Sequence, residues 1–154
     1  MVIFFKSLFA EILSVLAMTY SDTGKRETLL YRVNGNCTEE PGSWGHEYVR
    51  HLAAEIGEVY HYLTLPPGEV AHVVEEEDPV KPFSKALEEL PPSLSKPPTT
   101  EQLLSLALNL VPFFLRHNAE PDAVDLLLEL EAIEKIVDFV DSENYQKTCL
   151  YLIS

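Results

Sequence analysis

From Ser43 to Tyr62 the chain reads SWGHEYVRHLAAEIGEVYHY, and this stretch decides the fold. Its apolar side chains recur every three or four residues, which is the spacing of one face of an α-helix. The sequence therefore predicts a helix with Ser43 as its N-cap and with one face buried against other elements. That face consists of Trp44, Tyr48, Leu52, Ile56, Val59 and Leu63.

The same stretch contains a candidate metal site. His46 and Glu47 begin like the HExxH motif of zinc proteases, but the next histidine, His51, lies one residue too far along the chain. At about 100° per residue, the two imidazoles are roughly 140° apart around a helix and cannot both reach one ion. We therefore expect a solvated contact of Glu47 with Arg50 or His51. A hydrolase or metalloenzyme that uses His46, Glu47 and His51 is the alternative hypothesis.

Other motifs for chemistry are missing from the sequence. It has no GxSxG elbow, no GxGxxG turn and no P-loop. Cys37 and Cys149 lie far apart and form no CxxC pair, so neither a disulfide framework nor a structural zinc site is expected. Cys149, within an apolar run, is predicted to be a small buried side chain. We expect no catalytic residue, no metal and no cofactor.

Length and charge limit the class of protein. A chain of 154 residues is typical of one domain with a sizeable core. Its 25 acidic and 11 basic side chains give a formal charge of −14, and no segment forms a basic patch. Such a chain is repelled by nucleic acids and by anionic membrane surfaces. Partners are therefore expected to be proteins rather than nucleic acid, membrane or a small-molecule substrate.

The beginning of the chain is apolar but does not have the pattern of a signal peptide. No positive charge precedes the apolar run, and Lys6 and Glu11 interrupt it. The spacing instead predicts a helix that ends near residues 19–21 and needs a partner to cover its apolar stripe. The stripe consists of Leu8, Ile12, Val15, Leu16 and Tyr20.

Residues 25–33 form a short second element whose spacing favours a helix, although the same residues also suit a strand. Residues 64–98 differ in composition, because they contain eight of the eleven prolines and the acidic run at 75–78. Proline and mutually repelling acids oppose regular structure, so an extended insertion is predicted. Within it, residues 83–90 could form one or two helical turns.

The next expected helix runs from residue 102 to about 118, with Thr99 or Thr100 as its cap. It is apolar nearly all round, which indicates burial on several sides, and it is too short for a membrane span. Pro112 is expected to kink it.

A further helix at 121–130 is expected to begin with Pro121, and a final one follows a cap at Asp141 or Ser142. Its apolar stripe is unfinished at residue 154, which suggests a piece of something longer. Together these elements predict an all-α fold of antiparallel helix pairs in an α-solenoid-like, HEAT/TPR-like arrangement, as a single domain over 1–154 with the insertion at 64–98.

Several blocks of the sequence resemble one protein family, both in their residues and in their order along the chain. The blocks are ILSVLAMT at 12–19, SWGHEYVRHLA at 43–53, HNAE at 117–120, DLL at 125–127 and CLYL at 149–152. The family is the large non-ATPase subunit of the base of the 26S proteasome regulatory particle. The chain resembles its N-terminal region, and a fungal member most of all. Residues 65–98 are longer and richer in proline than this resemblance leads us to expect.

The resemblance implies a non-enzymatic scaffold that regulates ubiquitin-dependent protein degradation through protein contacts in the cytoplasm and nucleus. Its implied partners are other base subunits, in the ATPase ring, and the remainder of the scaffold subunit. Receptor surfaces in the family belong to a toroid of proteasome/cyclosome repeats that this chain lacks, so no protein-binding residue is assigned. A truncated product without independent function is the other alternative.

Overall fold

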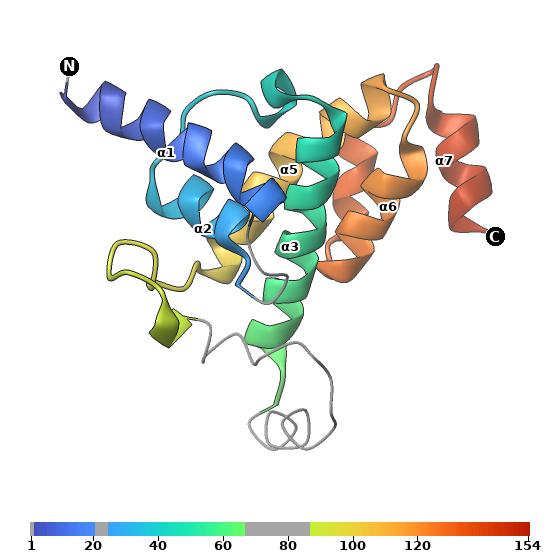
Figure 1. Ribbon diagram of the computed structural model, residues 1–154. Helices are drawn as coiled ribbons and strands as arrows, with labels where there is room; N and C mark the ends of the chain where they lie inside the picture. Colours follow the sequence, from blue (N-terminus) through green and yellow to red (C-terminus); the bar gives the residue numbers. More distant parts are fainter. Residues whose placement is uncertain (1, 21–24, 67–86) are drawn as a thin grey trace.

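The computed structural model describes residues 2–20, 25–66 and 87–154 (Figure 1). All regular structure in these ranges is helical, which confirms the all-α fold class. Successive elements pack on one another, α1 on α2, α5 on α6 and α6 on α7. The elements are α1 (Val2–Tyr20), α2 (Glu27–Asn34), η1 (Pro41–Trp44), α3 (His46–Thr64), α5 (Thr100–Arg116), α6 (Glu120–Glu129), η2 (Ile133–Asp138) and α7 (Tyr145–Leu152).

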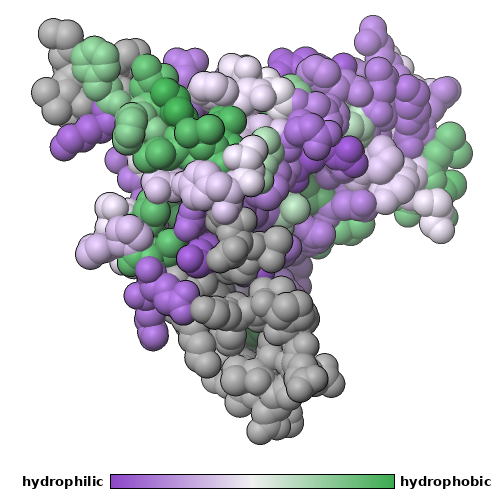
Figure 2. All heavy atoms as spheres, viewed as in Figure 1, coloured by the Kyte–Doolittle hydropathy of each residue, from purple (hydrophilic) through white to green (hydrophobic). Residues whose placement is uncertain are grey.

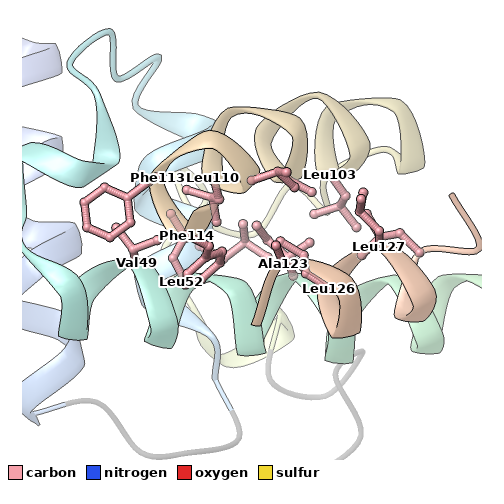
Figure 3. Close-up of a cluster of buried hydrophobic side chains, with 14 of the residues drawn as sticks. Val49, Leu52, Leu103, Leu110, Phe113, Phe114, Ala123, Leu126 and Leu127 are labelled. Atoms are coloured by element: carbon pink, nitrogen blue, oxygen red, sulfur yellow. The ribbon is translucent and has the colours of Figure 1, made fainter. Parts of the chain in front are cut away.

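Helix α3 is the centre of the fold, and it contacts α2, α5 and α6. Figure 3 shows Val49 and Leu52 of α3 facing Leu110 and Phe114 of α5, with side chains of α6 beside them. The predicted buried face is confirmed for most of its length. Tyr48, Leu52, Ile56 and Val59 are fully buried, and Leu63 is partly buried against the core.

The predicted start of this helix is wrong. Ser43 is not the N-cap, because residues 41–44 form the separate turn η1 and α3 begins at His46 after Gly45. Gly45 has φ +98° and ψ 171°, a backbone region that is nearly restricted to glycine, and it turns the chain out of the helical path. Trp44 therefore lies outside the helix and is 39% exposed instead of buried.

Helix α1 packs on α2 through a face that its apolar stripe did not indicate. The buried residues of this face include Glu11, Ser14 and Ala17. The predicted stripe lies largely at the surface, because Ile12 and Leu16 are exposed. The second element is a helix and not a strand.

Helix α5 agrees with its prediction at the N-terminus. The Thr99 side chain accepts a hydrogen bond from the Gln102 backbone N–H over 3.2 Å, and the Gln102 side chain accepts one from the Thr99 backbone N–H over 2.9 Å. This reciprocal capping box satisfies two donors at the helix start. Pro112 lies inside the helix without ending it. The burial expected on several sides is confirmed for Leu103, Ala107, Leu110, Val111, Phe113, Phe114 and Leu115.

The C-terminal elements differ in detail from expectation. Pro121 stands in the first turn of α6, as predicted. The turn η2 was not predicted, and α7 begins at Tyr145 with Asn144 as its N-cap residue. Asp141 orders the preceding turn instead, because its Oδ1 accepts from the backbone N–H groups of Glu143 and Asn144. Cys149 is exposed, so its predicted burial is wrong, because the packed side of α7 contains Thr148.

Part of the predicted insertion at 64–98 is described. Leu90 and Leu94 are buried against the core, and Asn34 Nδ2 donates to the backbone oxygens of Leu94 and Lys96. Residues 67–86, with the acidic run and the first half of the turns proposed at 83–90, lie outside the described residues, whereas residues 87–89 are helical. None of the helices in the described ranges combines the length and apolarity needed to cross a membrane.

Candidate interaction surfaces

A buried ion pair joins the first three helices. Arg32 of α2 donates from Nη2 to Glu11 Oε1 of α1 over 2.7 Å, from Nε to Tyr48 Oη of α3 over 2.9 Å, and from Nη1 to the Glu39 backbone oxygen over 2.9 Å. The Trp44 indole N–H also donates to Glu11 Oε1, over 3.1 Å. A buried charge is tolerated where such partners satisfy it. Arg32 thus fixes α1 against α2, α3 and the loop before η1.

Tyr48 extends this hydrogen-bond network from Arg32 to Ser14, and the donor and acceptor of each bond can be assigned. Ser14 Oγ donates to the Thr28 backbone oxygen over 2.7 Å, so its single proton is used there. Tyr48 must then donate its own proton to Ser14 Oγ, 2.7 Å away, while it accepts from Arg32. Burial raises the pKa of Tyr48, which keeps this hydroxyl protonated.

A second hydrogen-bonded contact connects α3 with the start of α2. The N-cap residue of α2, Arg26, provides no side-chain cap. Glu55 of α3 does so instead, because its Oε2 accepts from the Leu29 backbone N–H over 2.8 Å. Its other oxygen lies 3.2 Å from His51 Nε2. This hydrogen bond to Glu55 raises the pKa of His51.

The structure places the residues of the candidate metal motif in different surroundings. His46 lies among aromatic rings of α5 and its C-cap, 5.7 Å from Phe113 and 6.1 Å from His117 between ring centroids. His51 pairs with Glu55, not with Glu47 as expected. Arg50 lies 3.7 Å from Asp122 of α6. Within the described ranges, no three His, Cys, Asp or Glu side chains gather closely enough to hold a metal ion.

A groove with a volume of about 950 Å³ lies between residues 36–42 and α5. Its lining includes the exposed Glu39, Glu40, Glu101 and Arg116 and the buried Arg32, which is paired with Glu11, so most of the exposed charges along its rim are acidic. Cys37 also lines it, and burial raises the pKa of that thiol. A thiol with a raised pKa is a poor nucleophile at neutral pH.

Two exposed apolar surfaces lie at opposite ends of the molecule, over α1 and over α7 (Figure 2). Monomeric proteins rarely expose large contiguous apolar patches without an interaction to explain them. The first, the α1 face, consists of Phe5, Phe9, Ile12, Leu16 and Tyr20. The second, the C-terminal face, consists of the exposed apolar side chains of α7 and of the residue after it, Tyr145, Leu150, Leu152 and Ile153.

Sequence reasoning missed the residues that hold these surfaces in place. Glu11 was seen only as an interruption of an apolar run, and Glu55 and Arg32 were not singled out. One signal was available for Glu11, because a lone acid in an otherwise apolar helix must find a buried partner when that side packs. No local pattern indicates Glu55, whose role as a cap depends on the approach of two helices.

Comparison with known proteins finds relatives of this sequence over almost the whole chain. The family model for the RPN1 N-terminal domain matches residues 4–154. The chain is 46% identical to the 26S proteasome regulatory subunit RPN1 of Candida glabrata and 48% identical to that of Schizosaccharomyces pombe, each over 97% of the chain. It is 39% identical to the 26S proteasome non-ATPase regulatory subunit 2 homolog B of Arabidopsis thaliana over the same share.

The chain spans only 13–14% of the length of these relatives. The match nevertheless extends over almost the whole chain, including α1 at one end and α7 at the other. Identity above 45% to the two fungal proteins over 149 residues leaves no other family to consider. The chain therefore belongs to the RPN1 N-terminal domain family, the family of the non-ATPase regulatory subunits of the 26S proteasome.

Proposed function

We propose that this chain is a non-catalytic scaffold segment of the proteasome base and acts through protein contacts in ubiquitin-dependent degradation. The match of residues 4–154 to the RPN1 N-terminal domain carries this proposal. Its partners are the ATPase ring of the base and the remainder of the scaffold subunit, and its place is the cytoplasm and nucleus. A scaffold needs folded surfaces rather than reactive groups, in agreement with the separate surroundings of His46 and His51.

The C-terminal face supports a contact with the remainder of the scaffold. Thr148 is the buried residue of α7, and polar contacts hold the helix on α6. Tyr151 donates to Asp125 over 2.8 Å, and Lys147 lies 3.8 Å from Glu120. Burial of the exposed C-terminal face would then come from the next helices of the scaffold, as each repeat of a solenoid covers its neighbour.

The charge of the chain supports a basic partner surface. With 25 acidic against 11 basic side chains, its outer helix faces attract Lys- and Arg-rich surfaces and repel acidic ones. Contacts of this kind accelerate association and weaken as salt rises. We therefore place the ATPase-ring contact on acidic surface, such as the rim of the groove beside α5.

A chimera tests the proposal. In the Schizosaccharomyces pombe relative, the region that matches this chain is replaced by residues 1–154, and base assembly is followed on native gels. The chimera is expected to assemble with the ATPase subunits and to support growth. Leu150→Glu on the C-terminal face should impair assembly, whereas the paired substitution His46→Ala with His51→Ala should have little effect on it. A stable, folded chimera that recovers no ATPase subunit would refute the proposal.

A further inference from the structure

The α1 face has the spacing of a helix-pairing seam. Its residues are separated by four, three, four and four positions, from Phe5 to Tyr20. A repeat that alternates three and four residues keeps one stripe facing a second helix at a shallow crossing angle. A groove of about 620 Å³ lies along the N-terminal part of the stripe, from Phe5 to Ile12, and Leu13, Tyr31 and Leu94 are among its other lining residues. The surface is therefore shaped to receive the side chains of another helix.

The charge around α1 differs from the rest of the molecule. Residues 1–36 carry four basic and three acidic side chains, whereas the other 118 residues carry seven basic and 22 acidic ones. Within α1 itself, Lys6 is exposed and Glu11 is buried in its pair with Arg32. A second copy of a chain with charge −14 is repelled least at this face.

We propose that the α1 face is a self-association surface, at which two copies pair their α1 helices antiparallel about a two-fold axis near Ile12. This inference is independent of the scaffold role. In such a pair, Phe9 faces Leu16 of the second copy, Phe5 faces Tyr20 of the second copy, and the two Ile12 side chains meet. The spacing is nearly symmetric about a point between residues 12 and 13, because Phe9 and Leu16 lie three and four positions from Ile12 and Phe5 and Tyr20 seven and eight, and a self-complementary contact requires such symmetry.

Charge selects the antiparallel arrangement over the parallel one. Burial, Tyr31 and Glu27 together raise the pKa of Tyr20 to about 12, which places Glu27 close to the Tyr20 end of the α1 face. An antiparallel pair brings Lys6 of each copy toward Glu27 of the other. A parallel pair would bring the two Lys6 side chains together, and like charges at a helix interface are destabilising.

The area of the α1 face is sufficient for a weak dimer. Its five side chains are between 39 and 63% exposed. At roughly 200 Å² for each large apolar side chain, the face offers about 500 Å² per copy and about 1,000 Å² per dimer, near the lower limit for a specific interface. We expect a dissociation constant of roughly 1–100 μM.

Sedimentation velocity on the purified chain tests the association across concentration. The wild type should pass from monomer to dimer, and Phe9→Glu should raise the dissociation constant more than about 100-fold, because each dimer loses two apolar contacts and gains two desolvated carboxylates. Leu150→Glu places the same change on the C-terminal face and should leave the equilibrium unchanged. A wild type that stays monomeric at 1 mM, or a dimer lost in Leu150→Glu and kept in Phe9→Glu, would overturn the proposal.

Cross-linking tests the register. In a background with Cys37→Ser and Cys149→Ser, Ile12→Cys should form a dimer under mild oxidation, since residues on the axis approach within disulfide range. Leu16→Cys should not, because it faces Phe9 of the second copy. A parallel pair would cross-link both variants equally, and that outcome would contradict the antiparallel arrangement. Helical circular dichroism of each variant separates a lost contact from a lost fold.

Exchanging the charges of Lys6 and Glu27 tests whether the two side chains meet across the dimer interface, because the double variant should restore the dimer that each single variant weakens. Lys6→Glu and Glu27→Lys should each raise the dissociation constant about fivefold at low salt, because each dimer loses two opposite-charge pairs. The double variant restores opposite charges and should return to the wild-type value. Additive weakening in the double variant would show that Lys6 and Glu27 do not meet across the interface.

Discussion

Arg32 and Glu11 form a 2.7 Å ion pair in which the side chains are only 4% and 2% exposed. The pair is one of the links between α1 and the rest of the fold, beside the hydrogen bonds of Ser14, because Arg32 also donates to Tyr48 of α3. Buried ion pairs add little stability relative to an apolar pair of similar volume, but loss of one partner leaves an uncompensated charge in the core. Loss of either partner is therefore expected to weaken the packing of α1 on the rest of the fold.

Glu11→Ala should lower the free energy of unfolding by about 3–5 kcal/mol, because it leaves the Arg32 guanidinium buried without its carboxylate. Urea denaturation followed by the fluorescence of Trp44, the single tryptophan, measures this change. Glu11→Leu combined with Arg32→Met should cost less than Glu11→Ala. Asp122→Ala, which removes the exposed partner of Arg50, is the control and should cost less than about 1 kcal/mol. Equal effects of Glu11→Ala and Asp122→Ala would contradict a buried pair.

The contact between His51 and Glu55 predicts a pH dependence. The folded-state pKa of His51 lies above the ordinary histidine value of about 6.5, so the folded state favours the protonated imidazole. The resulting stabilisation is fully present below about pH 6.5 and is lost as the pH rises through the folded-state pKa. The difference in unfolding free energy between wild type and His51→Gln should therefore shrink from pH 5.5 to pH 8.5.

The magnitude of this effect is limited, because the His51 side chain is 39% exposed and solvent screens the pair. His61→Gln changes an exposed histidine of the same helix and serves as the control. A difference that grows with pH would have the wrong sign for this pair.

Thr28 provides a test of a buried hydroxyl. Its side chain is fully buried, and its Oγ1 has no hydrogen-bond partner among the described residues. Thr28→Val removes the unsatisfied hydroxyl with little change in shape and should raise the unfolding free energy by about 1 kcal/mol. Thr148→Val is the matched control, because the buried Thr148 hydroxyl donates to the Asn144 backbone oxygen over 3.0 Å. The control should be neutral or slightly destabilising, and destabilisation by Thr28→Val would show that the hydroxyl has a partner.

The spacing of apolar residues correctly predicted α3, which is buried along one face, and α5, which is buried on several sides. Leu52 and Ile56 repeat along one face of α3, and the capping residue Thr99 precedes α5 in sequence, so local signals were sufficient. The resemblance to a proteasome subunit was also recognisable from blocks such as residues 43–53.

The same reasoning failed where a distant contact decides the outcome. In α1, apolar residues occur on more than one side, and the burial of Glu11 by Arg32 selects the packed face and leaves Ile12 exposed. Trp44 was assigned to the buried face of α3 because its spacing fits that face. The non-helical backbone of Gly45, however, separates Trp44 from the helix. The cap that Glu55 provides for α2 joins residues 26 positions apart and has no local signature.

Gly45→Ala tests the junction between η1 and α3. A Cβ at this position would meet nothing within 4 Å, so any loss of stability comes from the backbone, whose φ of +98° is strained for an L side chain. The substitution should lower the unfolding free energy by about 1–3 kcal/mol and shift the Trp44 emission, because the indole N–H bonds to Glu11 only while the junction holds its angle. Ser43→Ala, in an exposed position of the same segment, should change stability by less than about 0.5 kcal/mol. If Gly45→Ala is as stable as Ser43→Ala, helix α3 begins before Gly45, and Trp44 belongs to its buried face after all.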